Sequence, residues 1–161
     1  INKKFKFHVY DDLSYISSKF DIITMFHVLE HIPYQLKVLK NLKKKLKNKG
    51  KIIIEVPHAQ DFLLEILNLE SFKKFTFWSE HLVLHTEKSL KKLLKEAGYK
   101  NIRINFYQRY NLNNHFGWML KNKPGGHKIY KNLFKNKIKE KYENFLINKK
   151  LSDTLIAIAD N

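Results

Sequence analysis

The segment from residue 20 to residue 58 constrains the fold of this chain more than any other. An apolar run over 20–26 is typical of a strand buried on both faces. A second apolar run follows over 51–56, and leucines at helical spacing lie between the two. Strand, helix and strand in this order form one β-α-β unit with parallel strands and a right-handed crossover. The sequence therefore predicts an α/β protein.

The predicted helix of this unit follows Pro33. Its apolar residues recur every three or four positions, while lysines occupy the remaining positions. We expect Gly50 to end the helix, because glycine favours the position after a helix terminus. The apolar side of this helix consists of Leu36, Leu39, Leu42 and Leu46.

Ionisable side chains follow the first strand of the unit directly. His27, Glu30 and His31 come after Phe26 at its carboxyl end. Open α/β sheets bind their ligands outside the carboxyl ends of parallel strands. This turn is therefore the predicted functional site.

The rest of the chain supplies further predicted elements. Residues 61–78 are aromatic and irregular in period, which fits a lid or substrate-side segment and equally fits ordinary core aromatics. Thr86 can cap a helix that Gly98 ends. We expect strands at 5–10, 101–107 and 154–159 and a helical region at 128–148.

Length and composition favour one globular domain of a reducing compartment. The chain has 161 residues, 43% of them hydrophobic, and no cysteine. It has no apolar run of about 18 residues, the length that spans a bilayer, and no apolar signal segment at its start. We therefore expect a cytoplasmic protein. Because a strand is predicted within a few residues of Ile1, we also expect the chain to be cut upstream of its natural beginning.

The formal charge of +16 raises the possibility of a nucleic-acid partner. Nearly all of the excess is lysine, and only Arg103 and Arg109 offer the bidentate fork that reads bases and grips phosphates. A solvated basic surface is the favoured interpretation, so no nucleic-acid partner is expected. A basic, non-catalytic RNA-binding module remains the alternative.

Three segments in order resemble class I S-adenosylmethionine-dependent methyltransferases of the small-molecule type. They are FDIITMFHVLEHI from residue 20, LKNKGKIIIEVPH from residue 46 and EHLVLHTEKSLKKLLKEAGY from residue 80. The family pattern has an acidic strand start, a His-x-Leu-Glu-His turn, a Gly stop, a Val-Pro strand end and a later Glu-His. Lys49 replaces the proline that usually precedes the Gly stop.

The resemblance implies a Rossmann-like sheet truncated at its N-terminus, with strands three to seven present and the last strand antiparallel. Residues 1–161 would then be a partial methyltransferase domain, and 108–150 a substrate-side helical insertion within it. The Gly-rich turn that holds the cofactor in the family is missing, since none of the five glycines forms a Gly-x-Gly pattern. This chain alone therefore carries half of a cofactor site.

The resemblance also assigns residues to S-adenosylmethionine. Asp12 and Leu13 fall where the family contacts adenine, and Phe26 and His27 fall beside the methionine end and the sulfonium. An acidic acceptor suits the adenine amino group, and aromatic walls keep water from a cationic sulfonium. The alternative is that Asp12 is only a turn residue and Phe26 only a core residue.

Methyl transfer to a hydroxyl needs a positioned acceptor and a base. His27 is the predicted base, because its ordinary pKa lies near working pH and it follows a strand end. Glu30 and His31 are predicted to act with it, directly or as support. The predicted substrate is a small molecule, a sugar or nucleotide-sugar hydroxyl, which the aromatic and amide side chains of the insertion would contact: Tyr110, Asn114, His115 and Trp118.

A metal-assisted RNA 2'-O-methyltransferase is a further alternative. Some small-RNA and ubiquinone-pathway methyltransferases carry Glu-x-x-Glu-His at this turn and bind a divalent ion there. Here His27 replaces the first glutamate, and His81 stands where the RNA enzymes have a later histidine. The loss of one oxygen donor disfavours magnesium. We therefore predict no metal ligands from the sequence.

Overall fold

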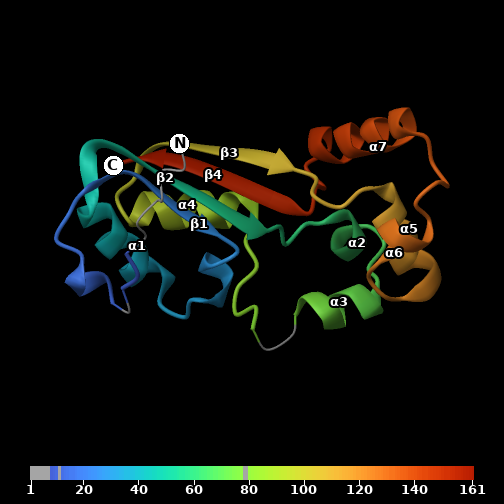
Figure 1. The fold of residues 1–161 in the computed structure, drawn as a ribbon, viewed down its shortest axis with the longest axis horizontal. Helices are drawn as coiled ribbons and strands as arrows, with labels where there is room; N and C mark the ends of the chain where they lie inside the picture. The colour runs from blue at the N-terminus through green and yellow to red at the C-terminus, as the bar shows by residue number, and fades with distance from the viewer. Residues whose placement is uncertain (1–7, 11, 78–79) are drawn as a thin grey trace, which may run out of the picture.

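A computed structural model describes residues 8–10, 12–77 and 80–161. Its centre is a sheet in the order β1-β2-β4-β3 (Figure 1). β1 and β2 are parallel, and β4 is antiparallel to both β2 and β3. This confirms the predicted β-α-β unit and the antiparallel last strand. The strands are β1 (Phe20–Phe26), β2 (Leu46–Pro57), β3 (Lys100–Tyr107) and β4 (Thr154–Asp160).

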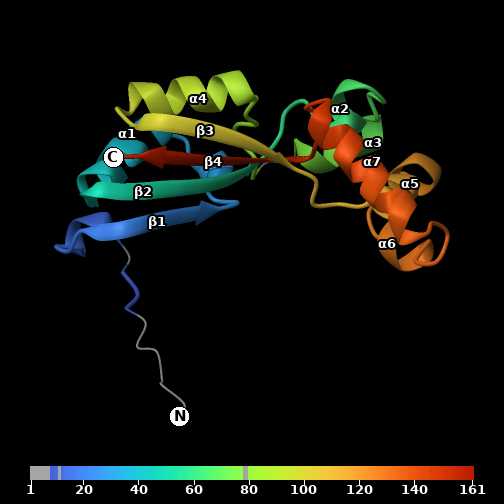
Figure 2. The same ribbon diagram turned by 90° about the horizontal axis from the view of Figure 1, so that it is seen from above.

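Two helices, α1 (Gln35–Lys44) and α4 (Glu87–Glu96), pack against one face of this sheet and contact each other (Figures 1 and 2). The apolar side of each helix meets the inward side chains of the strands, which removes both apolar surfaces from water. The fully buried centre of this core is Leu29, Leu39, Leu90, Leu94, Ile52, Ile54, Val56 and Leu155.

The predicted helix at Thr86 is confirmed as α4. The Thr86 hydroxyl accepts from the backbone N–H of Ser89 at 3.1 Å, and the Ser89 hydroxyl accepts from the Thr86 N–H at 2.9 Å. This reciprocal capping fixes where the helix starts. Gly98 follows its end with φ of +90°, a conformation that glycine adopts without a Cβ penalty.

The prediction that Gly50 ends the first helix was wrong. α1 ends at Lys44, and Leu46 already pairs with Phe20 at the start of β2. Leu46 keeps its helical spacing but is buried as a strand residue. Gly50 is needed for close approach instead, since a Cβ there would lie 2.9 Å from the carbonyl oxygen of Phe20.

Five helices gather beyond the carboxyl ends of β2 and β3 (Figure 1). Two short helices form within the aromatic segment 61–77, for which the sequence showed no regular period. A turn divides the helical region predicted at 128–148, and a further helix precedes it within 108–150, the predicted helical insertion. The helices are α2 (Phe62–Glu65), α3 (Glu70–Thr76), α5 (Leu112–Lys121), α6 (Gly126–Ile129) and α7 (Asn136–Asn148).

The strand predicted at 5–10 falls mostly outside the described residues. The three of its residues that are described, 8–10, have no helical or strand conformation. Within the described part of the chain the sheet therefore has four strands, and β1 lies at one edge. Two short 3-10 helices flank β1, η1 (Leu13–Tyr15) before it and η2 (Leu29–His31) after it.

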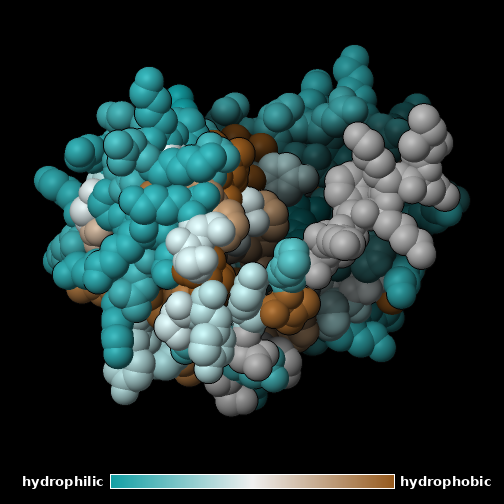
Figure 3. Space-filling model, turned by 60° about the vertical axis from the view of Figure 1, so that its left-hand side comes forward, coloured by the Kyte–Doolittle hydropathy of each residue, from teal (hydrophilic) through white to brown (hydrophobic). Residues whose placement is uncertain are grey.

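The surface is mostly hydrophilic, with apolar residues exposed in places. Figure 3 shows this mixture on one face of the molecule. Along the β1 edge, Phe20, Ile22 and Phe26 are each more than one third exposed. None of the helices formed by the described residues is long and apolar enough to cross a bilayer.

Candidate active site

His27 lies at a sharp backbone bend where β1 ends. Its φ is +51°, in the left-handed region that only a few per cent of residues other than glycine adopt, with histidine among the more frequent. The bend is supported by the neighbouring strand, because the His27 N–H donates to the carbonyl of Glu55 at 3.0 Å. A strained residue at the carboxyl end of a parallel strand is typical of a functional site.

Three charged side chains surround the His27 ring. Nδ1 lies 3.3 Å from Oε1 of Glu30, and Nε2 lies 3.0 Å from Oε1 of Glu55. The guanidinium of Arg109 also contacts Nε2. A guanidinium only donates hydrogen bonds, and an ionised carboxylate only accepts them. Nε2 can therefore accept a hydrogen bond from Arg109 when it carries a lone pair, and it can donate one to Glu55 when it carries a proton.

The two carboxylates and the arginine shift the pKa of the His27 imidazole in opposite directions. Glu30 raises the pKa of His27, while burial and the charge of Arg109 lower it, and the net direction is upward. Burial alone would raise the pKa of Glu30, but the His27 and His31 rings outweigh it and the pKa is lowered. Glu30 is therefore an ionised carboxylate with no exposed surface.

The loop after α3 brings a third histidine to this corner. The Glu30 carbonyl accepts from the backbone N–H groups of Leu82 and Val83, at 2.9 and 3.3 Å. His81 precedes them, and its ring lies 5.0 Å from the ring of His31. Ligand atoms of Glu30, His31 and His81 all lie within 4.8 Å of one another.

A cavity of about 420 Å³ opens beside His27, beyond the carboxyl end of β2. Its walls combine aromatic rings with charged and polar groups from five segments of the described chain. Such a mixture suits a small polar ligand with one apolar side. The lining includes His27, Pro57, Asp61, Phe72, Phe75, His81, Arg109, Tyr110 and Asp153.

Two buried carboxyl groups belong to the cavity wall. Asp61 caps α2 by accepting from the N–H of Leu63 at 2.5 Å, and burial raises the pKa of Asp61 to about 7. Asp153 accepts from the backbone N–H groups of Arg109 and Tyr110, at 3.0 and 2.9 Å. Burial raises its pKa as well. Asp153 thus fixes the loop that presents Arg109 and Tyr110.

The structure brings the predicted catalytic residues His27, Glu30 and His31 together. Phe26, predicted beside the sulfonium, is 54% exposed next to them. Asp12 and Leu13, predicted to contact adenine, lie elsewhere. Asp12 accepts from the N–H of Ser14 and lines a separate surface pocket beside the carboxyl half of α1.

Only one of the four predicted substrate residues, Tyr110, lines the cavity. The other three side chains are buried against the chain itself. Asn114 accepts from the N–H of Gly125 at 3.3 Å, and His115 lies 2.7 Å from the hydroxyl of Tyr142. The Trp118 ring packs edge-on against Phe72 at 5.0 Å, behind the cavity wall.

Sequence reasoning missed Glu55, Arg109, Asp61 and Asp153. Glu55 is paired with Phe26 by the register of the parallel strands, which no local pattern shows. One signal was available for Arg109, because it is one of two arginines and follows the end of a predicted strand. The two aspartates look like ordinary turn residues in the sequence.

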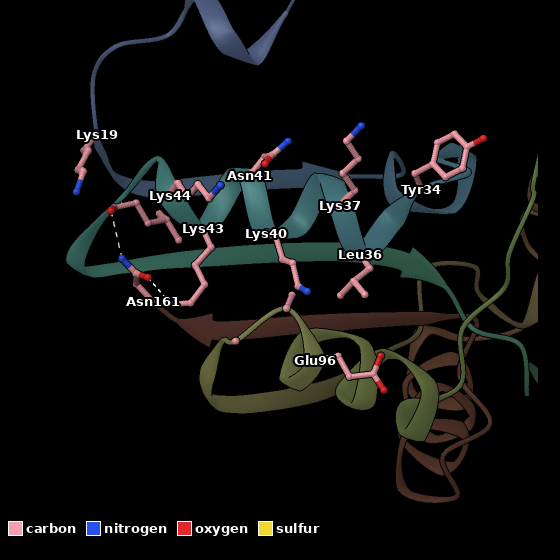
Figure 4. A pocket seen from close by; sticks show the side chains of 13 residues that line it. Lys19, Tyr34, Leu36, Lys37, Lys40, Asn41, Lys43, Lys44, Glu96 and Asn161 are labelled. Atoms are coloured by element: carbon pink, nitrogen blue, oxygen red, sulfur yellow. Dashed lines mark hydrogen bonds between the residues drawn. The ribbon is translucent and has the colours of Figure 1, made fainter.

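A larger cavity, about 980 Å³, lies at the opposite end of the sheet. Figure 4 shows Lys40 and Lys43 pointing from α1 toward α4 and Asn161, while Lys37 points away. Lys43 donates to the side chain of Asn161 at 2.5 Å. Glu96 is the one acidic residue in this lining. The groove thus offers positive charge without the acid-base groups of the His27 corner.

The sheet order, the antiparallel last strand and the acid-base groups at the carboxyl ends define a Rossmann-like class I methyltransferase fold. A family model described as a methyltransferase domain matches residues 1–104. This match covers more than half of the chain, and the chain belongs to that methyltransferase family. A search of the curated proteins finds no match.

Solved structures of methyltransferases share this fold. A SAM-dependent methyltransferase from Archaeoglobus fulgidus superposes with a TM-score of 0.53 at 17% identity, covering 92% of this chain and 63% of its own. A possible histamine N-methyltransferase from Thermotoga maritima gives a TM-score of 0.56 at 14% identity, with 92% and 60% covered.

A third similar structure contains the methyl donor. It is Haemonchus contortus phosphoethanolamine N-methyltransferase 2 in complex with S-adenosyl-L-methionine, with a TM-score of 0.50, 17% identity, and 88% and 33% covered. At these identities the similarity concerns the fold. The chain spans less than two thirds of the length of each of these proteins.

Proposed function

We propose that the protein transfers a methyl group from S-adenosylmethionine to a hydroxyl of a small polar acceptor, a sugar or a nucleotide sugar. The observation that carries this proposal is the position of His27. It lies at the carboxyl end of a parallel strand, between two carboxylates and an arginine, and it lines a cavity of about 420 Å³.

The residues at the end of β1 fit the sulfonium end of the methyl donor. Phe26 offers a half-exposed aromatic face, which attracts a cation and excludes water from it. The Glu30 and Glu55 carboxylates add negative charge nearby. When bound, S-adenosylmethionine supplies a methyl group on a positively charged sulfur. Adenine contacts from Asp12 and Leu13 remain a prediction of the family resemblance.

His27 accepts the proton that the acceptor hydroxyl loses. The hydroxyl oxygen forms a bond to the methyl carbon, the carbon–sulfur bond breaks, and the electron pair stays on sulfur in S-adenosylhomocysteine. Nε2 takes the hydroxyl proton as its contact changes from Arg109 to Glu55. Glu30 faces Nδ1 and stabilises the imidazolium that forms.

Arg109 and the aromatic rings favour a nucleotide sugar among small acceptors. The Arg109 side chain is 45% exposed at the cavity rim, where its fork can pair with a phosphate. Tyr110, Phe72 and Phe75 supply flat apolar faces for the carbon side of a sugar ring. The acceptor thus places its charged end at the rim and its hydroxyl beside His27.

The test uses the protein expressed from its complete reading frame. S-adenosylmethionine is titrated in a calorimeter, and transfer of an isotope-labelled methyl group to a panel of nucleotide sugars and simple sugars is measured. We expect saturable binding and labelling of at least one sugar hydroxyl. No heat on titration, or labelling confined to amines, would overturn the proposal.

A further inference from the structure

We propose that Glu30, His31 and His81 form a binding site for one divalent transition-metal ion of the Zn²⁺ class. Their ligand atoms lie within 4.8 Å of one another, and none of the three makes the Glu55 or Arg109 contact of His27. The proposal concerns metal binding and does not depend on methyl transfer.

The carboxylate of Glu30 is buried with two imidazoles near it but no hydrogen bond within the described residues. The side chain has no exposed surface, and neither oxygen has a hydrogen bond of good geometry among the described residues. Its nearest ring nitrogens are Nδ1 of His27 at 3.3 Å and Nε2 of His31 at 3.8 Å. A buried carboxylate is costly unless it is paired or binds a metal ion.

Both histidines are held in the tautomer that a metal ion requires. Nδ1 of His31 donates to the carbonyl of Glu80 at 2.6 Å, and Nδ1 of His81 donates to the carbonyl of Thr76 at 2.7 Å. A carbonyl can only accept, so each ring carries its lone pair on Nε2. Backbone carbonyls that orient the second ring nitrogen are the usual support of histidine metal ligands.

The backbone around the three ligands is also fixed. The two hydrogen bonds from Leu82 and Val83 to the Glu30 carbonyl join the loop to η2. Further along the loop, Nε2 of His85 lies 3.0 Å from the side-chain oxygen of Gln35, whose amide donates to Leu29 at the start of η2. The loop that follows His81 is therefore held against the segment that carries Glu30.

The donor set selects the class of metal. Two imidazoles and one carboxylate suit Zn²⁺ and related transition metals, whereas Mg²⁺ prefers oxygen ligands throughout. Bond lengths near 2.1 Å place the donors of a tetrahedral zinc site about 3.4 Å apart, so the widest spacing in the cluster needs to contract by up to about 1.4 Å. The fourth position would be free for water or an acceptor oxygen, a role that rests on the proposed function.

The test measures metal binding alone. The protein from its complete reading frame is freed of metal with a chelator and titrated with Zn²⁺ by calorimetry and with Co²⁺ by visible absorption. We expect one ion per chain and the d–d bands of a four- or five-coordinate Co²⁺ site. Mg²⁺ at the same concentrations should give no saturable heat.

Variants assign the binding to this cluster. Glu30→Gln and His81→Asn should each weaken Zn²⁺ binding by more than about 100-fold, since even outer-shell partners are worth 10- to 100-fold. The matched control is His127→Asn, an exposed histidine on α6, which should bind normally. Circular dichroism checks folding, and His31→Asn replaces either variant that fails to fold.

Three results would overturn the proposal: no stoichiometric Zn²⁺ uptake, equal uptake in the cluster variants and the wild type, or Mg²⁺ binding as tight as Zn²⁺. None of these measurements contains the methyl donor or an acceptor. A failure here therefore leaves the proposed methyl transfer standing, and a failure of methyl transfer leaves the metal site standing.

Discussion

Oε1 of Glu55 lies 3.0 Å from Nε2 of His27, across two parallel strands in which Glu55 faces Phe26. The register of β1 and β2 thus places a carboxylate beside the ring nitrogen that faces Arg109. Glu55 is 20% exposed, so its charge is only partly screened by water. In the proposed reaction this carboxylate accepts a hydrogen bond from Nε2 once His27 has taken up the proton.

Replacing Glu55 with glutamine should slow methyl transfer by about 10- to 150-fold, because a hydrogen bond to a charged group is worth about 1.5–3 kcal/mol. The measurement is kcat for the labelled acceptor at saturating S-adenosylmethionine. Glu70→Gln on the exposed side of α3 is the matched control and should keep the wild-type rate. An unchanged kcat in Glu55→Gln would contradict the assigned role.

Asp61→Asn should make the protein more stable than the wild type at high pH but not at low pH. Burial raises the pKa of Asp61 from 3.8 to about 7, so the folded state binds this proton more tightly than the unfolded state. The stability that the proton provides is complete below pH 4 and is lost as pH rises through 7. Asparagine imitates the protonated form and keeps the cap on α2.

The two proteins should therefore unfold alike near pH 4 and differ by up to about 4 kcal/mol at pH 8, since one pKa unit corresponds to about 1.4 kcal/mol. Urea unfolding at both pH values measures the difference. Asp21→Asn, at an exposed position, should show no such pH-dependent difference. A gap that stays constant between the two pH values would contradict the raised pKa of Asp61.

An element of the fold could be predicted where the residues that determine it lie close together in the sequence. α4 was predictable because its cap at Thr86, its apolar spacing and its terminal Gly98 all lie within one short segment. The end of α1 was not, because Leu46 fits both the helical spacing and the first inward position of β2. The bounds of α5, within the predicted helical insertion 108–150, were missed because the helix contains asparagines and a glycine and is buried almost all round.

The sequence predicted only those residues of the candidate site that belong to a single turn. His27, Glu30 and His31 lie within five residues, and the strand-end rule brought them to a ligand-binding edge. Glu55 and Arg109 reach the same imidazole through strand register and a distant loop, which are properties of the whole sheet. The aromatic insertion pointed to a substrate region, but packing buried His115 and Trp118 and left Tyr110 at the cavity.

Leu94→Ala should lower the free energy of unfolding by about 2–5 kcal/mol, because Leu94 is fully buried where α4 packs on the sheet. Lys95→Ala, at the next and exposed position, should change it by no more than about 0.5 kcal/mol. Urea unfolding measures both. Similar losses in the two variants would contradict the packing of α4.

Gly126→Ala should separate α6 from α5. A Cβ at this position would lie 2.1 Å from the carbonyl oxygen of Asn113 and 2.7 Å from Cα of Gly117, so the two helices must move apart. The expected loss of stability is about 1–3 kcal/mol. Lys128→Ala, on the exposed side of α6, is the control. Equal thermal unfolding of the two variants would contradict this close contact.

The central claim is that His27 accepts the proton of a hydroxyl during methyl transfer. His27→Asn tests it most directly, because asparagine tolerates the left-handed backbone at this bend but cannot act as the base. Single-turnover transfer of labelled methyl is compared with the dissociation constant of S-adenosylmethionine measured on the same variant. The account predicts a loss of at least about 100-fold in the transfer rate with the dissociation constant little changed. A transfer rate equal to that of the wild type would contradict it.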